Sequence, residues 1–207
     1  MLVNNAIEHL TINKRSAGSA LIVCIFITST LSAQDGLEGV RNSNQARRIP
    51  DVMYIPTPHD VAAEMLKLAK VSDKDLVFDL GCGDGRILVM AAKKHGCRAV
   101  GIDVDPLRVQ DARLNVKKHR VEHLVTIKQG DLFNVDLRAA TVVMLYLSTK
   151  YNTKLIPQLS QMKPGSRVVS HQFGMTRVKP DRIVSMKSHD GHEHTLLLWK
   201  VPLTGRP

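Results

Sequence analysis

Aromatic residues are scarce in this sequence, in which one Trp, three Tyr and four Phe account for 4% of 207 residues. So few rings argue against a protein that binds single-stranded nucleic acid by stacking bases on aromatic side chains. Cysteines are also few, and Cys24, Cys82 and Cys97 lie in dissimilar segments that do not suggest a disulfide framework. Long apolar runs are missing as well, because the run over residues 20–31 is short of the roughly 20 residues that a membrane-spanning helix needs. A disulfide scaffold and a multi-spanning membrane protein are therefore excluded.

The composition that remains is typical of a globular protein, with 43% hydrophobic and 23% charged residues. A chain of 207 residues has room for one ordinary domain and a tail. The net charge of +10 concerns partners rather than the fold, and it favours contact with acidic surfaces, anionic lipid or nucleic acid. Residues 1–33 hold two basic residues and one acidic residue, a net +1, so about +9 belongs to the rest of the chain.

Residues 1–33 have the order of a secretory signal peptide. Lys14 and Arg15 precede the apolar run, and the small residues Ser32 and Ala33 follow it. A cleavable signal is the preferred interpretation, ahead of a short membrane anchor and of an ordinary apolar helix behind a misassigned start. The basic residues ahead of the run favour an outward-facing domain. Residues 34–50 show no apolar period and are expected to be a linker.

Short apolar strands alternate with amphipathic helices over residues 51–201, and residues 202–207 form a tail. The expected helices cover residues 60–71, 86–95, 106–119 and 150–162; the expected strands cover residues 76–80, 99–102, 124–128, 141–147 and 167–171; a final hairpin covers residues 182–187 and 195–201. This order predicts an α/β fold of the Rossmann-like type. It has seven strands in a mostly parallel sheet, helices on both faces and a C-terminal antiparallel hairpin.

The unusual residues lie where the predicted parallel strands end, which is where such sheets bind ligands. The first strand runs into residues 79–85, with three glycines at a spacing of two, a loop that lets the backbone approach a nucleotide or nucleoside. The second strand ends at Asp103, 22 residues beyond Gly81, where a carboxylate can accept both hydroxyls of a ribose. The third ends at Gly130 and Asp131, a second acceptor suited to an amino group such as that of adenine.

Three segments resemble the successive motifs of the class I, seven-strand S-adenosylmethionine-dependent methyltransferases. They are residues 78–86 (FDLGCGDGR), 101–106 (GIDVDP) and 130–133 (GDLF), and the resemblance extends over roughly residues 51–201. Residues 54–58 (YIPTP) and 164–171 (PGSRVVSH) are similar to a subgroup of protein-lysine methyltransferases that act on membrane carriers and on the c-ring protein of ATP synthase. The subgroup match is the less specific of the two.

The resemblance implies S-adenosylmethionine as the cofactor. It places the glycine loop around the methionine portion, Asp103 on the ribose and Asp131 beside the adenine, with Tyr54 and Thr57 closing over the cofactor. The full set of expected cofactor-binding residues is Tyr54, Thr57, Asp79, Gly81, Gly83, Asp84, Gly85, Asp103, Asp131 and Leu132.

Little side-chain catalysis is needed, because a sulfonium is already a good methyl donor and the protein mainly has to align the acceptor and exclude water. The fourth strand is expected to deliver Tyr146 or Leu147 to the transfer site. It lacks the Asn/Asp-Pro-Pro-Tyr sequence of many methyltransferases of adenine, amide or glutamine nitrogens, which weakens the case for those acceptors. His171 is a candidate for orienting or deprotonating the acceptor, although a hydrogen-bonded structural histidine is the preferred interpretation.

Two other kinds of site compete with this one. Tyr146 and Lys150 match the Tyr-x3-Lys pair of short-chain dehydrogenases, but the first should end a strand and the second begin a helix, and the glycine spacing is wrong for NAD. His189, His192 and His194 suggest a metal, but a solvated hairpin turn is the preferred interpretation, and no metal is expected.

The preferred function is methylation of a lysine in a protein, presented near an anionic membrane surface, with no specific nucleic acid as partner. A small-molecule methyltransferase is the first alternative, and an exported binding module that keeps the cofactor fold without activity is the second. The location stays open, because the leader indicates export or membrane association while the cofactor motifs need a compartment that supplies the cofactor. The oligomeric state is not determined by the sequence.

Overall fold

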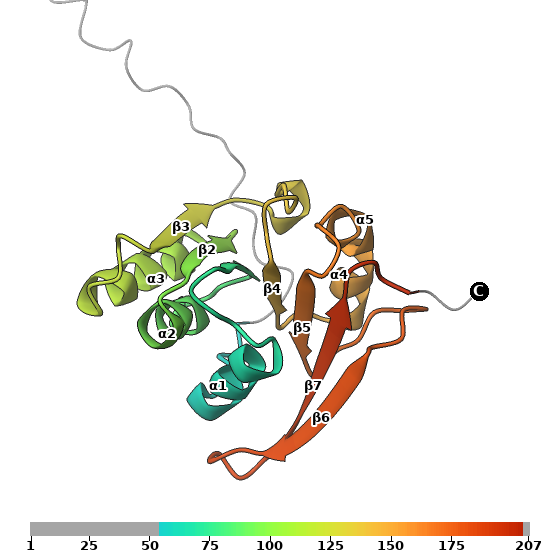
Figure 1. Ribbon diagram of the computed structural model, residues 1–207. Coiled ribbons are helices and arrows are strands. Elements are labelled where there is room, and N and C mark those ends of the chain that lie inside the picture. The colour runs from blue at the N-terminus through green and yellow to red at the C-terminus, as the bar shows by residue number, and fades with distance from the viewer. Residues whose placement is uncertain (1–53, 205–207) are drawn as a thin grey trace, which may run out of the picture. The chain divides into compact units, whose positions relative to one another are not determined.

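The computed structural model describes residues 54–204, which form one seven-stranded sheet with helices against it (Figure 1). The strands stand in the order β3-β2-β1-β4-β5-β7-β6. Their bounds are β1 (Leu76–Leu80), β2 (Arg98–Asp103), β3 (Val125–Gln129), β4 (Val142–Leu145), β5 (Arg167–His171), β6 (Arg182–Lys187) and β7 (Glu193–Lys200). β1 to β5 are parallel, whereas β7 pairs antiparallel with β5 and with β6. The predicted mixed α/β sheet with its terminal hairpin is confirmed.

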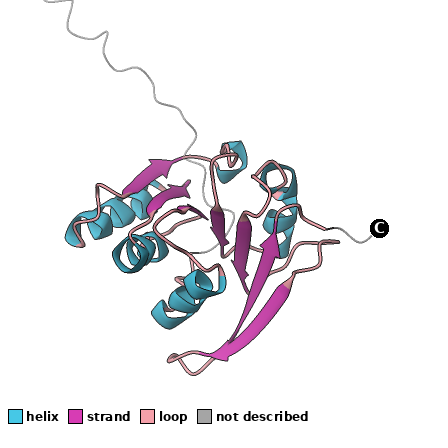
Figure 2. Cartoon of the chain, viewed as in Figure 1, coloured by secondary structure: helices cyan, strands magenta, loops and turns pink. Residues whose placement is uncertain are grey.

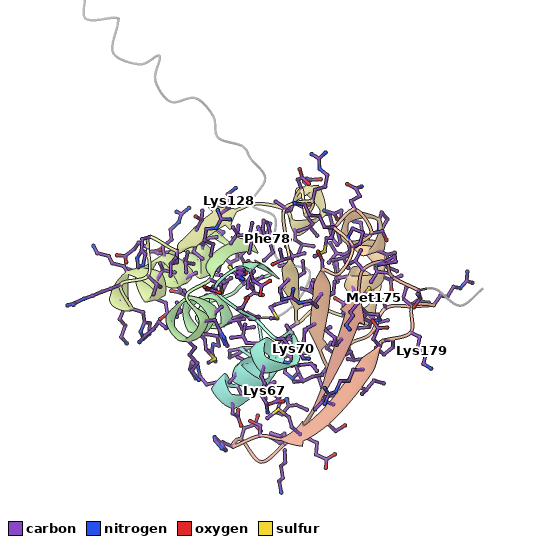
Figure 3. The ribbon with its side chains drawn as sticks, in the orientation of Figure 1. Lys67, Lys70, Phe78, Lys128, Met175 and Lys179 are labelled. Carbon is purple, nitrogen blue, oxygen red and sulfur yellow. The ribbon has the colours of Figure 1, made fainter. Side chains whose placement is uncertain are left out.

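The helices divide between the two faces of the sheet (Figure 2). Their bounds are α1 (His59–Leu68), α2 (Arg86–His95), α3 (Pro106–Lys118), α4 (Thr149–Lys154) and α5 (Ile156–Leu159), with a 3-10 turn η1 (Leu132–Asn134) after β3. Buried residues of α1, α2 and α3 form one core cluster with one face of the strands, and buried residues around α4 and α5 form the second. Phe78 of β1 and Met175, both labelled in Figure 3, belong to the second cluster.

The alternation of side chains along each strand produces these two cores. In β4, Val142 and Met144 join the first cluster, while Val143 and Leu145 join the second. All four side chains are fully buried, which is why the strand reads as an unbroken apolar run in the sequence.

The strand order reverses beside β1, which pairs with β2 on one side and with β4 on the other. The crevice at the carboxyl ends of β1 and β4 is therefore the expected ligand position of the fold. The hairpin of β6 and β7 runs past the end of β5, and its turn lies against α1 (Figure 1), where the Ser188 hydroxyl donates to Asp60 Oδ1 at 2.7 Å.

Most element bounds lie within three residues of those expected from the sequence. The predicted single helix over residues 150–162 is wrong, because the chain makes two short helices, α4 and α5, that meet at Leu155. Pro157 lies in the first turn of α5; it has no N–H to donate to the preceding turn, so the helix cannot run through it.

The leader and the linker proposed for residues 1–50 lie outside the described residues. Within residues 54–204, no helix combines the length and the apolar character needed to cross a membrane.

Candidate active site

The loop from Gly81 to Gly85 leads from β1 directly into α2. The backbone N–H groups of Gly81 and Cys82 both donate to the carbonyl oxygen of Ile102, at 2.8 and 3.0 Å, and so tie the loop to β2. Gly85 is the N-cap of α2 and has φ +74°, in the left-handed region where glycine is favoured. The loop therefore keeps its backbone close to the carboxyl ends of β1 and β2.

Asp103, the last residue of β2, holds the neighbouring loops in place. Its Oδ2 accepts from the N–H of Gly83 at 2.9 Å, and its Oδ1 accepts from the N–H of Asp105 at 3.0 Å. Burial raises the pKa of this carboxyl, although the backbone N–H groups partly oppose the shift. The carboxylate keeps lone pairs that can accept further hydrogen bonds.

Asp79, one residue before the end of β1, is the most perturbed carboxyl near the loop. Its side chain is buried, and within the described part of the chain it has no hydrogen bond or ion pair. Burial raises its pKa to about 8, and the negative charges of Asp103 and Asp84 add to the rise. A buried carboxyl without a partner, repelled by two others, is a place for a cationic group.

Asp84, by contrast, is already paired. Its Oδ2 lies 2.6 Å from Nη2 of Arg86, and Nη1 of the same arginine donates to the carbonyl oxygen of Thr57 at 3.1 Å. Burial alone would raise the pKa of Asp84, but the hydrogen bonds and the charge of Arg86 lower it overall. The pair thus joins the glycine loop to the segment that precedes α1.

Tyr54 covers the glycine loop from that segment. A Cβ on Gly83 would overlap a carbon of the Tyr54 ring, so a residue without a side chain is required there. The guanidinium carbon of Arg108 lies 4.8 Å from the centroid of the same ring, on its face. This arrangement supports the prediction that the Tyr54 segment closes over the loop.

A cavity of about 610 Å³ opens between these elements, at the carboxyl ends of β1, β2 and β4. That volume suits a cofactor-sized ligand. Of the predicted site residues, those that line it are Tyr54, Thr57, Asp79, Gly81, Asp84, Asp103, Asp131, Leu132 and Tyr146. Gly83, Gly85 and His171 do not line it, because the first two serve the backbone path and the histidine is fully buried.

The far wall of the cavity follows β3. The carboxylate of Asp131 accepts from the N–H of Phe133 at 3.0 Å and begins the 3-10 turn that carries Leu132. The rings of Phe133 and Tyr151 are stacked with centroids 5.7 Å apart, and Nζ of Lys154 lies 3.8 Å from the Phe133 centroid. An ammonium already lies on an aromatic face at this wall.

Tyr146 follows β4 directly, and its ring separates His171 from the cavity. The centroids of the two rings are 3.9 Å apart. Burial raises the pKa of the Tyr146 phenol, so this group stays neutral in the physiological range. The sequence leaves His171 open between an acceptor-orienting group and a structural histidine; the structure places it behind Tyr146, at the end of β5, with hydrogen bonds on both ring nitrogens.

The prediction of a solvated histidine turn is wrong for His194. It belongs to β7, is 9% exposed, and its Nδ1 lies 2.8 Å from Nε2 of His171. The strand begins two residues earlier than expected, and the alternation along it turns this side chain inward. Within residues 54–204, no group of three or more His, Cys, Asp or Glu side chains is placed to hold a metal ion.

Sequence reasoning missed the residues that α4 brings to the cavity. Lys150, Tyr151 and Lys154 line it together with Phe133, yet the apolar pattern of this segment predicts a helix without fixing its orientation. One signal was available in the scarcity of aromatics, since all three tyrosines of the sequence, Tyr54, Tyr146 and Tyr151, line the cavity.

S-adenosylmethionine fits the chemistry of this cavity. The cofactor carries an ammonium and a sulfonium, and the buried, unpartnered carboxyl of Asp79 with two acidic neighbours suits positive charge. Asp103 supplies an acceptor for hydroxyl groups, and the glycine loop keeps side chains away from the backbone path. The residues present therefore match the cofactor that the sequence motifs imply.

Comparison with known proteins agrees with this fit. The family model of the ANTKMT methyltransferase domain matches residues 79–182. The chain is 42% identical over 156 residues to a protein-lysine N-methyltransferase of Saccharolobus islandicus (strain REY15A), covering 74% of this chain and 96% of that protein. It is 29% identical over 131 residues to a Xenopus laevis lysine N-methyltransferase named for the C-type protein of ATP synthase, covering 63% of this chain and 57% of that one.

A solved structure adds the cofactor. It is the crystal structure of an RNA methyltransferase from Salinibacter ruber in complex with S-adenosyl-L-homocysteine, 47% identical, with a TM-score of 0.67 over 71% of this chain and 94% of that one. S-adenosylhomocysteine is what S-adenosylmethionine becomes when its methyl group is transferred, so the cofactor of this fold is S-adenosylmethionine. The chain belongs to the family of the ANTKMT methyltransferase domain and is an S-adenosylmethionine-dependent methyltransferase.

Proposed function

We propose that this enzyme methylates the side-chain amine of a lysine in a protein. The observation that carries the proposal is the aromatic wall at the acceptor end of the cavity, built by Phe133, Tyr146 and Tyr151. Aromatic faces attract ammonium groups, and Lys154 of this chain already lies on one of them, 3.8 Å from the centroid. The same surface can hold the ammonium of a substrate lysine.

The chain's own residues would bind and position both partners. Asp79 and Asp103 hold the cofactor, which supplies an electrophilic methyl group when bound. Tyr146 holds the acceptor at the end of β4, on the side of the cavity that faces the cofactor position. A lysine amine has a pKa near 10.4 in water, and desolvation beside the aromatic wall favours its neutral, nucleophilic form.

Similarity to two lysine N-methyltransferases supports a protein acceptor over a small molecule. Membership in a methyltransferase family removes the alternative of a binding module without activity.

An RNA acceptor is the second candidate, and two observations favour it. The similar Salinibacter ruber structure is titled an RNA methyltransferase. A groove of about 790 Å³ beside the cavity is also rich in basic residues, among them Lys93, Lys94 and Lys118. Basic grooves attract phosphates, but they attract acidic proteins equally. The missing Asn/Asp-Pro-Pro-Tyr sequence at the end of β4 argues against a base nitrogen as acceptor.

The experiment is a labelling of cell fractions. Purified protein is incubated with methyl-tritiated S-adenosylmethionine and separately with membrane protein, soluble protein and total RNA of the source cell. We expect label in protein bands, at methylated lysine by mass spectrometry, and its loss in Asp79→Asn. Label confined to RNA would establish the second candidate, and label confined to small molecules would refute both.

Presentation of the lysine near an anionic membrane surface is a further part of the proposal. It rests on the net charge of +10 and on the leader, which lies outside the described residues. Stronger labelling of membrane protein than of soluble protein is expected. The N-terminal residue and the cell fraction of the mature protein test whether the leader is cleaved.

A further inference from the structure

We propose that a buried chain of four side chains, Thr57–His171–His194–Asp190, carries a proton from the acceptor end of the cavity to the protein surface. The inference rests on the proposed function, because a lysine enters as an ammonium and leaves methylated only after it has lost one proton. That proton needs an exit from a pocket that excludes water.

The four groups are connected by successive hydrogen-bond contacts. Thr57 Oγ1, which lines the cavity, lies 3.4 Å from Nδ1 of His171. Nε2 of His171 lies 2.8 Å from Nδ1 of His194. Nε2 of His194 lies 3.1 Å from Oδ2 of Asp190, an exposed residue in the turn between β6 and β7.

Donor and acceptor roles follow from the far end of the chain. The carboxylate of Asp190 can only accept, so Nε2 of His194 donates to it. A neutral His194 then accepts at Nδ1, which makes Nε2 of His171 the donor and its Nδ1 the acceptor. The Thr57 hydroxyl therefore donates to His171, and its lone pairs can accept from a group in the cavity.

Burial makes the chain the route by which His171 can exchange protons. Its side chain has 0% exposure, and the Tyr146 ring covers it on the cavity side. Burial lowers the pKa of His171 to about 4, and the neighbouring His194 lowers it further than Asp190 raises it, so the ring is neutral and ready to accept. The titratable groups that face it are Tyr146 after β4, His194 on β7 and Asp190 in the hairpin turn.

The hairpin turn is fixed where the chain ends. The carboxylate of Asp60 accepts from the hydroxyl of Ser188 at 2.7 Å and from the N–H of His189 at 2.8 Å. Asp190 Oδ1 in turn accepts from the N–H of His192 at 2.8 Å. The acceptor of the last proton therefore has a defined position at the surface.

The proton balance is as follows. The acceptor ammonium gives one proton to Thr57 Oγ1, and the hydroxyl proton of Thr57 moves to Nδ1 of His171. The Nε2 proton of His171 moves to Nδ1 of His194, and the Nε2 proton of His194 moves to the Asp190 carboxylate, which releases it to water. One proton enters and one leaves, and the amine keeps the electron pair that forms the new N–C bond.

His194→Gln is the variant that tests the chain, because it retains hydrogen bonding but cannot pass a proton. His192→Gln is the matched control, the same substitution two residues away on an exposed side chain. Initial rates are measured from pH 6 to 10 with tritiated S-adenosylmethionine and total source-cell protein as acceptor. For His194→Gln we expect a rate lowered by about 100-fold at pH 7, a deficit that shrinks toward pH 10 where free lysine amine is abundant.

A purely structural role would move other quantities instead. It would lower the melting temperature and the affinity for S-adenosylhomocysteine, and it would reduce the rate equally at every pH. Should His194→Gln lose more than a few degrees of melting temperature, Asp190→Asn decides, because it changes an exposed group: a rate deficit that grows toward low pH supports the chain. Wild-type pH profiles in both variants would overturn it.

A second readout does not need an acceptor. In nitrogen-15 histidine spectra of the ligand-free protein at pH 6, we expect neutral His171 with its proton on Nε2. A proton on Nδ1 would reverse the hydrogen bonds and refute the relay. Wild-type protein that methylates no protein amine would refute the proposed function and the relay together, whereas an active wild type with unchanged variants would refute the relay alone.

Discussion

Cofactor binding should release a proton from Asp79, and Asp79→Asn should abolish that release. The pKa of this carboxyl is raised to about 8, first by burial and then by the charges of Asp103 and Asp84. At pH 7 a group with that pKa is about nine-tenths protonated. The ammonium of the cofactor favours the charged carboxylate and lowers its pKa, so about 0.9 proton per site should leave on binding at pH 7.

Titration calorimetry measures this number directly. The binding heat of S-adenosylmethionine is recorded at pH 7 in phosphate and in Tris, whose ionisation enthalpies differ, and the dependence on buffer gives the protons released. The Kd should also tighten by close to tenfold per pH unit between about pH 6 and 7. Asp79→Asn should show a Kd that does not vary over that interval. Wild-type heats that are identical in the two buffers would refute the reasoning.

The same group makes the ligand-free fold sensitive to pH. Its folded pKa lies above its unfolded value of 3.8, so the folded state binds more protons than the unfolded state between about pH 4 and 8. Its contribution to the unfolding free energy is therefore present below pH 4 and lost as the pH rises through 8. The melting temperature of wild type relative to Asp79→Asn should fall over that window, and a constant difference would contradict the assignment.

Three further substitutions test the site. Asp103→Ala should weaken cofactor binding by roughly 10- to 150-fold in calorimetry, because it removes a charge-assisted hydrogen bond worth about 1.5–3 kcal/mol and also frees the Gly83 N–H; an unchanged Kd would contradict its role. Gly83→Val should displace Tyr54, whose ring overlaps the position of the new Cβ, and weaken binding while the circular dichroism spectrum persists. Gly130→Ala, whose Cβ meets no atom within 4 Å, is its control, and equal affinities would mean that Tyr54 does not cover the cofactor. Tyr146→Ala should slow methyl transfer far more than it weakens cofactor binding, with Tyr146→Phe close to wild type; parallel loss of both in Tyr146→Ala would make the residue part of the core.

The sequence by itself determined the architecture and the cofactor end of the site. Buried parallel strands such as β4 appear as unbroken apolar runs, and the residues where they end are local in sequence, so Asp79, the glycine loop and Asp103 could be found by spacing alone. The resemblance to class I methyltransferases rests on those same short segments.

Other parts could not be read locally. The break between α4 and α5 follows from Pro157, a signal present in the sequence, but the orientation that brings Tyr151 and Lys154 to the cavity depends on packing against the second core cluster. Asp84 and Asp79 are five residues apart and equally acidic in the sequence. Only the fold gives one of them Arg86 as a partner and leaves the other buried without one, so their pKa values move in opposite directions.

The histidine chain shows the same limit most clearly. His171 and His194 are 23 residues apart, on β5 and β7, and Thr57 is more than a hundred residues from either. Their contact depends on the antiparallel register of β7 against β5, in which His171 lies opposite Leu196, and on a shift of two residues in where β7 begins. A strand shifted by one residue turns every side chain to the other face, so the inward position of His194 is decided by tertiary pairing and not by the residues around it.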